Sequence, residues 1–380
     1  MNVTGDWLNC AELQQVCAFL TTAGHVALAV GGSVRNALLD MPVADVDIAT
    51  DALPEKVSEL AQKAGFRVIP TGVDHGTLTV LVGERTYEVT TFRHDLHTDG
   101  RHAVVGFGAT LAEDAARRDF TMNALYAQAD GTVIDPLGGL PDLLARRVRF
   151  VGDPAARIAE DYLRILRFFR FYATHGDPEQ GIDSEGLAAC AALSAGIDTL
   201  SRERIGVEMR KLLAAPDPAP AMAAMASAGV LASVLPGADA DSLAVLVHLE
   251  DGLPPDWLRR LVILGGDDPT DALRLSRTES RDWALLRDLT GSAEGPGELA
   301  YRHGAALATS ALLLRGTVFE ADLPDGWQPA VAAGSTAQFP VVAADLMPDL
   351  QGQALGARLA ELETAWIGSD FTLTKAGLIR

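Results

Sequence analysis

The first third of the chain alternates short apolar runs with patterns of helical spacing. An apolar run over residues 26–30 predicts a buried strand. Three further strands, separated by turn signals, are predicted over residues 66–69, 77–82 and 86–92. Apolar residues at helical spacing predict helices over residues 12–23 and 54–64, each followed by a glycine. The pattern therefore predicts a small mixed sheet with helices on one side.

Helical patterns dominate the rest of the chain. Residues 155–173 are predicted to form one largely buried helix that carries six charged residues, among them Asp161, Arg164, Arg167 and Arg170. At ~100° per residue, Asp161, Arg164 and Arg167 fall within an arc of about 120°. Charges on a buried helix must face partners or a cleft. Two interpretations stay open: a binding site, or an internal network in which Glu160 pairs with Arg164.

A Gly-Gly turn at residues 31–32 follows the first strand. Two glycines let a backbone approach a ligand closely, and Ser33 is expected to cap a helix over residues 34–39 whose free N–H groups favour phosphate. Asp45 and Asp47 come next on a strand, where side chains two residues apart point the same way. Each feature alone is common in an ordinary turn or strand end. Together they suit Mg²⁺ and a nucleoside triphosphate.

The charge is uneven along the 380 residues, a length that suggests two or more domains. Lys and Arg total 31 against 51 Asp and Glu, and the net charge of −20 argues against a general nucleic-acid binder. The arginines nevertheless gather between residues 93 and 170, while acids concentrate later in the chain. Two interpretations follow: a basic cleft on an acidic body, or arginines paired with neighbouring acids on the surface.

The sequence also indicates where the protein works. No apolar run approaches the ~20 residues that span a bilayer, and the N-terminus lacks the pattern of a signal peptide. Cys10, Cys17 and Cys190 lack metal-ligand spacing and are predicted to be buried apolar residues, which fits a reducing cytoplasm. His248 and Asp251 lack the further His and Asp residues of a metal phosphohydrolase site. We therefore expect a cytoplasmic protein that does not enter a membrane.

The Gly-Gly-Ser-Val-Arg-Asn segment and the Asp-Val-Asp after it resemble the first motif of nucleotidyltransferases that extend RNA 3′ ends. These are the bacterial tRNA CCA-adding enzymes and their class II poly(A) polymerase relatives, which usually have Asp at the position of Asn36. The resemblance implies an α+β fold: a polymerase β-like nucleotidyltransferase sheet followed by an all-α neck, body and tail. The implied boundaries are 1–136 for the catalytic head, 137–214 for the base-recognising neck and 215–380 for the tRNA-binding body and tail. The match is strong over residues 26–211 and weak beyond.

Further segments resemble the family and imply site residues. Residues 117–125 match the second motif, with paired arginines that are expected at a helix start and of which Arg118 contacts the nucleotide. Glu88 is expected as a third acidic group near the metals, and the alternative is an outward-facing strand residue. Residues 93–108 are predicted to be a loop, with histidines that lack zinc spacing. They resemble a mobile segment that helps the switch from adding C to adding A, which is shortened in CC-only members and full length here.

The predicted helix over residues 155–173 matches the family region in which an Asp and an Arg bind the edge of the incoming base. Cytosine and adenine both present an exocyclic amino donor beside a ring-nitrogen acceptor. Asp161 can accept from the amino group, and Arg164 can donate to the ring nitrogen. Guanine and uracil present a carbonyl instead, and a buried polar group left unpaired costs about 1–3 kcal/mol. The resemblance further implies that Arg167 and Arg170 serve the phosphates and that ribose and triphosphate are bound by Gly32, Arg35 and Arg118.

These expectations combine into one function. The chain is expected to add C, C and A to the 3′ end of tRNA from CTP and ATP without a template, and to release pyrophosphate. Asp45 and Asp47 would hold two Mg²⁺, with Glu88 as the third catalytic acid. The alternatives are a poly(A) polymerase, an enzyme that adds only A and, in a different class, a tRNA-binding protein without catalysis. The sequence does not predict the oligomeric state.

Overall fold

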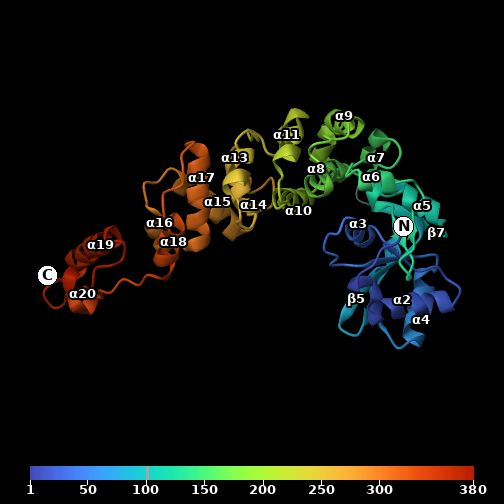
Figure 1. The fold of residues 1–380 in the computed structure, drawn as a ribbon, viewed down its shortest axis with the longest axis horizontal. Helices are drawn as coiled ribbons and strands as arrows, with labels where there is room; N and C mark the ends of the chain where they lie inside the picture. Colours follow the sequence, from blue (N-terminus) through green and yellow to red (C-terminus); the bar gives the residue numbers. More distant parts are fainter. Residues whose placement is uncertain (100–101) are drawn as a thin grey trace. The chain divides into compact units, whose positions relative to one another are not determined.

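The computed structural model describes residues 1–99 and 102–380 (Figure 1). The chain divides into two compact units. Unit 1 comprises Met1–Leu212 and Pro220–Val234, and unit 2 comprises Leu213–Ala219 and Leu235–Arg380. Unit 1 contains every β-strand of the described residues, whereas unit 2 is built from helices. The division into head, neck and body at residues 136 and 214 stays a prediction.

A seven-stranded mixed sheet forms the centre of unit 1, as the apolar runs predict. Its strands lie in the order β3-β4-β5-β2-β1-β8-β9. Strands β2 and β5 pair in parallel, and the other neighbours pair antiparallel. The strands are β1 Leu28–Val30, β2 Asp47–Thr50, β3 Arg67–Gly72, β4 Thr77–Val82, β5 Arg85–Thr91, β8 Tyr126–Ala127 and β9 Val133–Ile134. The last two have two residues each, too few for a periodic pattern in the sequence.

Two helices cover one face of this sheet. Helix α2 (Ala11–Thr22) and helix α4 (Pro54–Lys63) lie side by side against β4 and β5 (Figure 1). Apolar side chains of α2 and α4 are buried in this layer, among them Leu13, Leu20 and Val57. Each such burial is worth about 1.5–3 kcal/mol. On the opposite face, a second core joins Val30, Ala49 and Tyr126 of the sheet with Ala115 of α5 (Leu111–Ala116).

Residues 93–108 are not the loop that the sequence predicts. Strand β6 (Arg93–Asp99) and strand β7 (His102–Phe107) pair antiparallel and form a separate two-stranded sheet. The second half of this segment, His-Ala-Val-Val-Gly-Phe, carries strand-forming valines and phenylalanine. The charged first half hides this signal because it shows no apolar alternation. Residues 100–101 lie outside the described residues.

The single helix predicted over residues 155–173 is also wrong. The structure has two helices, α7 (Pro154–Glu160) and α8 (Leu163–His175), with a break at Asp161 and Tyr162. Asp161 is extended, with φ −156° and ψ 105°, and its Oδ1 accepts a hydrogen bond from the Leu163 backbone N–H at 3.1 Å. An aspartate that binds a nearby N–H in this way competes with helix continuation. The helical arc that places Asp161 beside Arg164 therefore does not exist.

The remaining elements of unit 1 surround these helices. Helix α3 (Gly32–Leu38) begins earlier than predicted, and Ser33 lies inside it instead of capping it. The Ser33 hydroxyl donates to the Val30 carbonyl at 3.4 Å. Cys17 and Cys190 are buried as predicted, whereas Cys10 is half-buried. The other helices are α1 Asp6–Asn9, α6 Leu140–Leu144, α9 Ser184–Ala192, α10 Arg202–Leu213, α11 Ala219–Ser227 and α12 Val230–Val234.

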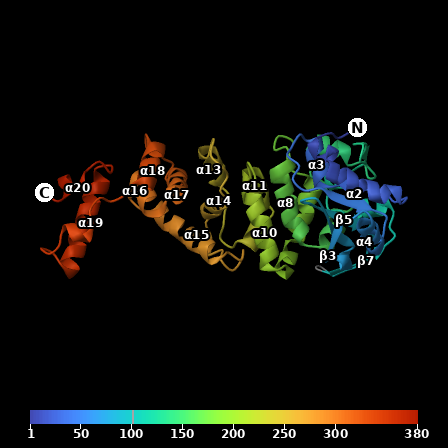
Figure 2. The ribbon, with the colours of Figure 1, turned by 90° about the horizontal axis from the view of Figure 1, so that it is seen from below.

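Unit 2 is a set of packed helices, of which α16, α17 and α18 lie side by side (Figure 2). Its helices are α13 Leu243–Leu249, α14 Trp257–Ile263, α15 Arg277–Thr290, α16 Pro296–His303, α17 Ala305–Val318, α18 Trp327–Thr336, α19 Gly352–Gly368 and α20 Lys375–Leu378. A buried ion cluster lies among them, in which Glu250 accepts from Arg259 at 2.7 Å and from Arg260 at 2.9 Å. No helix in the described ranges has the length and apolar character needed to cross a membrane.

Candidate active site

The Gly-Gly turn lies directly against two arginines. Gly31 has φ 69° and ψ −116°, a backbone conformation that a residue with a Cβ adopts only with strain. A Cβ added at Gly31 would lie 3.4 Å from Nη1 of Arg118, and one added at Gly32 would lie 3.7 Å from Nη2 of Arg35. Two guanidinium groups therefore supply positive charge at this turn. Helix α3 has only seven residues, so the charge is attributed to the arginines and not to the helix N-terminus.

Carboxylates meet next to this turn, at the start of β2. Asp47 lies opposite Glu88 of β5, and Val30 lies between Asp47 and Tyr126 in the same row of the sheet. Residues opposite one another in neighbouring strands share a face. Glu88 is therefore beside Asp47, as expected of a third acidic group, and it is also exposed, as expected of an outward-facing strand residue. Asp45 precedes β2 and is exposed, so the alternation rule of a strand does not fix its direction.

The pKa of Asp47 is raised, partly by the neighbouring acids. Although Asp47 is exposed, the surrounding protein removes part of its hydration and raises its pKa, and the neighbouring charges of Glu88 and Asp45 raise it further. Arg118 acts in the opposite direction. The start of β2 thus gathers three acidic groups whose mutual repulsion disfavours the ionised form of Asp47. A divalent cation would relieve this repulsion.

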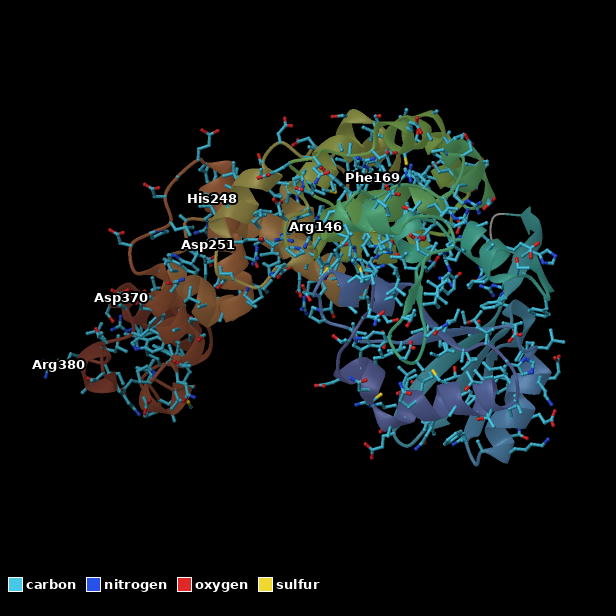
Figure 3. All side chains as sticks on the ribbon, turned by 45° about the vertical axis from the view of Figure 1, so that its right-hand side comes forward. Arg146, Phe169, His248, Asp251, Asp370 and Arg380 are labelled. Atoms are coloured by element: carbon cyan, nitrogen blue, oxygen red, sulfur yellow. The ribbon has the colours of Figure 1, made fainter. Side chains whose placement is uncertain are left out.

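The donor set at this place fits Mg²⁺ only in part. Across residues 1–99 and 102–380, no group of three or more His, Cys, Asp or Glu side chains stands at metal-ligating distances. Mg²⁺ is commonly held by one or two carboxylates, and the rest of its octahedron is filled by water and substrate phosphates. Asp45 and Asp47 fit that pattern. His248 and Asp251 of unit 2 are exposed and have no third ligand beside them within the same ranges (Figure 3).

A buried acid and a tyrosine hold Arg118 in place. Its Nε donates to the Tyr126 hydroxyl at 3.1 Å and its Nη2 to Asp114 at 3.2 Å, while the Tyr126 hydroxyl donates to Asp114 at 2.8 Å. Burial acts to raise the pKa of Asp114, but Arg118 and Arg117 hold it below its usual value. The two arginines follow the C-terminal end of α5 and do not start a helix, so that part of the prediction is wrong.

Sequence reasoning missed Asp114 and Tyr126. A signal for Asp114 was present, because it precedes Arg117 and Arg118 by three and four residues, the spacing at which helical side chains pair. Tyr126 gives no comparable signal. It lies in β8, which pairs with β1 across about a hundred residues of sequence, and no local spacing predicts that its hydroxyl reaches Arg118.

Arg35 is buried, with 8% of its surface exposed, and burial lowers its pKa to about 10. Its Nη1 donates to the Asn123 side chain at 2.5 Å, and Asn123 in turn donates to Asp119 at 2.8 Å. Three guanidinium groups surround the ring of Phe171 at 4.5–5.3 Å from its centroid, those of Arg35, Arg167 and Arg170. Arg35 therefore belongs to a cationic layer at the face of α8.

The acids of unit 1 neutralise most of this layer. Arg167 donates to Asp119 through Nε at 2.8 Å, and Arg170 donates to Glu208 of α10 through Nε at 2.5 Å. Burial acts to raise the pKa of Asp119, but Arg167 and Asn123 hold it below its usual range. His175, which ends α8, stays neutral because burial lowers its pKa to about 3.

The two residues expected to contact the base also have protein partners. Asp161 accepts from Nη2 of Arg204 at 2.7 Å. Arg164 donates to Glu160 and to the carbonyl of Arg157, so the internal pairing that the sequence offers as an alternative is present. Asp161 and Arg164 are both half-buried. A base can reach them only by sharing or replacing these contacts.

Two family models match the chain. The model described as Poly A polymerase head domain matches residues 27–149. The model described as probable RNA and SrmB-binding site of polymerase A matches residues 181–242. The first match covers the sheet, the Gly-Gly turn and Arg118. The second begins after α8 and ends near the boundary of unit 2.

Curated relatives share the N-terminal half most strongly. The mitochondrial CCA tRNA nucleotidyltransferase 1 of Mus musculus is 44% identical over 202 residues, which are 53% of this chain and 46% of that protein. The chain thus spans about half the length of the first curated relatives it matches. The CCA-adding enzyme of Geobacillus thermodenitrificans is 39% identical over 303 residues, which are 77% of this chain and 68% of that enzyme.

Solved structures extend the likeness to the whole chain. The Bacillus stearothermophilus CCA-adding enzyme in complex with CTP is 28% identical, has a TM-score of 0.74, and the alignment covers 94% of this chain and 93% of that one. The Thermotoga maritima CCA-adding enzyme complexed with tRNA has a TM-score of 0.71 and covers 96% of this chain and 93% of that one, but at 16% identity it shows the fold alone. Since the Geobacillus relative is matched over 68% of its length at 39% identity, this chain belongs to the family of the CCA-adding enzymes.

Proposed function

We propose that this protein adds C, C and A to the 3′ end of tRNA from CTP and ATP and releases pyrophosphate. The observation that carries the proposal is the meeting of Asp47 and Glu88 beside a Gly-Gly turn that contacts Arg118. The names of the relatives and the complex of one similar structure with CTP support the choice of substrates. Poly(A) synthesis is the second candidate, because the model that matches the head region carries that name.

The carboxylates and arginines have separate tasks in this proposal. Asp45 and Asp47 would hold Mg²⁺. The bound ion would lower the pKa of the tRNA 3′-hydroxyl and neutralise negative charge on the pyrophosphate. The oxygen of that hydroxyl forms a bond to the α-phosphorus, the bond to pyrophosphate breaks, and the proton leaves to solvent. Glu88 adds a third negative charge at the same place. Gly32 lets the triphosphate approach the backbone, while Arg118 and the buried charge of Arg35 attract it.

Base choice is assigned to the break between α7 and α8. Asp161 would accept from the exocyclic amino group that cytosine and adenine share, and Arg164 would donate to the adjacent ring nitrogen. Arg204 holds one oxygen of Asp161 and so fixes the direction of the carboxylate. Arg167 and Arg170 are held by acids, so we assign them a supporting role for the phosphate side through their charge near Phe171.

The experiment offers the protein tRNAs that end before, within and after CCA, with CTP or ATP alone and together. Addition of C, C and A that then stops supports the proposal. A long run of A on every RNA would identify a poly(A) polymerase, growth by A alone on tRNA-CC would identify an A-adding enzyme, and binding without growth would identify a tRNA-binding protein.

Asp45→Ala tests the metal assignment. The variant is expected to lose incorporation and to keep tRNA binding, because it removes a metal ligand and no RNA contact. Asp198→Ala is the matched control, since Asp198 is an exposed acid of the same unit. Near-normal incorporation by Asp45→Ala would reject the assignment. For the base assignment, exchanging Asp161 or Arg164 is expected to relax the choice of C and A before it stops chemistry, and unchanged selectivity would reject it.

A further inference from the structure

Asn36 connects an arginine of the site to the segment that carries the metal ligands. Its Oδ1 accepts from Nε of Arg35 at 3.1 Å and from Nη2 of Arg35 at 2.9 Å. Its Nδ2 donates to the backbone carbonyl of Pro42 at 2.9 Å. One amide therefore bridges a guanidinium and a carbonyl.

Chemistry fixes the orientation of this amide. A guanidinium only donates hydrogen bonds and a carbonyl only accepts them. Asn36 satisfies both with its oxygen toward Arg35 and its nitrogen toward Pro42, and the flipped amide satisfies neither. A carboxylate of the same length could accept from Arg35, but it would place an oxygen against the Pro42 carbonyl oxygen. With Arg35 and the Pro42 carbonyl as its partners, an amide at this position satisfies both, whereas an acid would satisfy only Arg35.

The tether holds the turn that leads to the carboxylates. The backbone carbonyl of Asn36 also accepts from the N–H groups of Leu39 and Met41, at 3.1 Å and 2.9 Å. Main chain and side chain of one residue therefore fix the chain where it leaves α3. Pro42 is three residues before Asp45 and five before Asp47. A shift of the Pro42 carbonyl is passed along this short segment to both metal ligands.

Asn36 also gives Arg35 a neutral partner in place of a carboxylate. Every side-chain hydrogen bond of Arg35 goes to a neutral amide, that of Asn36 or that of Asn123. In the described part of the chain no carboxylate forms an ion pair with it, in contrast to Arg167 and Arg170. Arg35 thus presents its positive charge near the Gly-Gly turn without an ion-paired carboxylate, while Asp119 acts on it through space.

We propose that Asn36 is a positioning residue of the nucleotide site, which keeps Arg35 free of an ion pair and holds the metal-ligand segment in register with it. The inference rests on the proposed function. It concerns binding of the Mg²⁺-nucleotide complex, because both groups that Asn36 touches act on that complex. Asn36 acts through Arg35 and the Pro42 carbonyl, and we assign it no contact with the substrate.

Two variants separate the charge from the tether. Asn36→Asp breaks the bond to Pro42 and adds a negative charge next to Arg35, whereas Asn36→Ala breaks the bond and adds no charge. For Asn36→Asp we expect the KM for CTP to rise roughly tenfold, and the Mg²⁺ concentration for half-maximal rate to rise by the same factor. A tenfold change corresponds to the loss of one hydrogen bond or charge contact worth about 1.4 kcal/mol. For Asn36→Ala we expect a similar rise in the Mg²⁺ requirement and a smaller rise in KM.

Binding is measured separately by isothermal titration of each folded protein with CTP in the presence of Mg²⁺. The matched control is Asn9→Asp, the same chemical change at an exposed position of unit 1, which should leave both values unchanged. If both variants keep the wild-type KM, Mg²⁺ requirement and CTP affinity, and differ only in melting temperature, Asn36 is merely structural and the inference is overturned. If the wild-type protein incorporates nothing, the proposed function fails, while the titration still decides the role of Asn36.

Discussion

The two charged regions of unit 1 are built in opposite ways. At the start of β2, Asp47 faces Glu88 and lies near Asp45, so acids adjoin acids, and the pKa of Asp47 is raised. On α8, Arg167 and Arg170 each contact a carboxylate. Charge is left uncompensated in the first region and is neutralised inside the protein in the second. Repulsion between the acids of the first region would be reduced by a bound cation. The charges of the second region are already balanced by protein partners.

This difference separates two ways of binding. A cation at the sheet relieves repulsion that the fold already contains, so its binding gains free energy from both attraction and relief. A base at Asp161 must compete with Arg204, and one at Arg164 must compete with Glu160. Its net gain is the difference between two sets of hydrogen bonds, and such differences are of order 1 kcal/mol. The geometry thus favours strong metal binding and finely balanced base choice.

The largest effect is expected for Asp47→Asn. The amide keeps the size of the side chain but removes the charge that attracts Mg²⁺, so incorporation should fall by more than about 10²-fold. Single-turnover incorporation of CMP on a tRNA lacking CCA measures this. A loss of less than about tenfold would mean that Asp47 is not a metal ligand.

The same variant should be more stable without metal. Because the pKa of Asp47 is raised in the folded state, its stabilising contribution is complete below its ordinary pKa and is lost as pH rises through the raised value. At pH 7 the ionised side chain is therefore a cost, and Asp47→Asn should melt at a higher temperature than the wild type. The difference should vanish on acidification to below the ordinary range for aspartate. A lower melting temperature at pH 7 would contradict the uncompensated charge.

How far the sequence predicts this molecule differs between the same two regions. The strands that carry Asp47 and Glu88 are predicted from the sequence, because strand alternation and turn signals are local rules. The break at Asp161 does not follow, since one hydrogen bond from a side chain to the Leu163 N–H overrides the helical pattern. The partner Tyr126 could not be predicted, because tertiary packing brings β8 beside β1.

A smaller effect is expected for Arg204→Met, which keeps the length of the side chain and removes its charge. Asp161 then keeps only its bond to the Leu163 N–H, and its carboxylate is free to turn. Its hold on the amino group of C and A weakens, so incorporation of UMP or GMP relative to CMP should rise about tenfold, the equivalent of 1.4 kcal/mol. Competition between CTP and UTP on the same tRNA measures it. An unchanged ratio would mean that Arg204 only supports the fold.

The smallest effect is expected for Tyr126→Phe, which removes one buried hydroxyl between Arg118 and Asp114. Arg118 keeps its bond to Asp114 through Nη2, so it loses one of two anchors and stays near the Gly-Gly turn. The lost hydrogen bond is worth about 1 kcal/mol, and the KM for CTP should rise about fivefold while kcat stays near the wild-type value. A fall in kcat with KM unchanged would instead place Arg118 on the transition state.

Tyr172→Phe is the matched control, because Tyr172 is also buried in unit 1 and its hydroxyl has no hydrogen bond to any described residue. Equal changes in KM for both variants would mean that loss of packing, and not loss of the Arg118 anchor, explains the result. A rise confined to Tyr126→Phe would show that the Tyr126 hydroxyl helps to hold Arg118, whose charge lowers the pKa of Asp47. Asp114 would then act on the site through Arg118, whereas Asp45, Asp47 and Glu88 lie near one another at the start of β2.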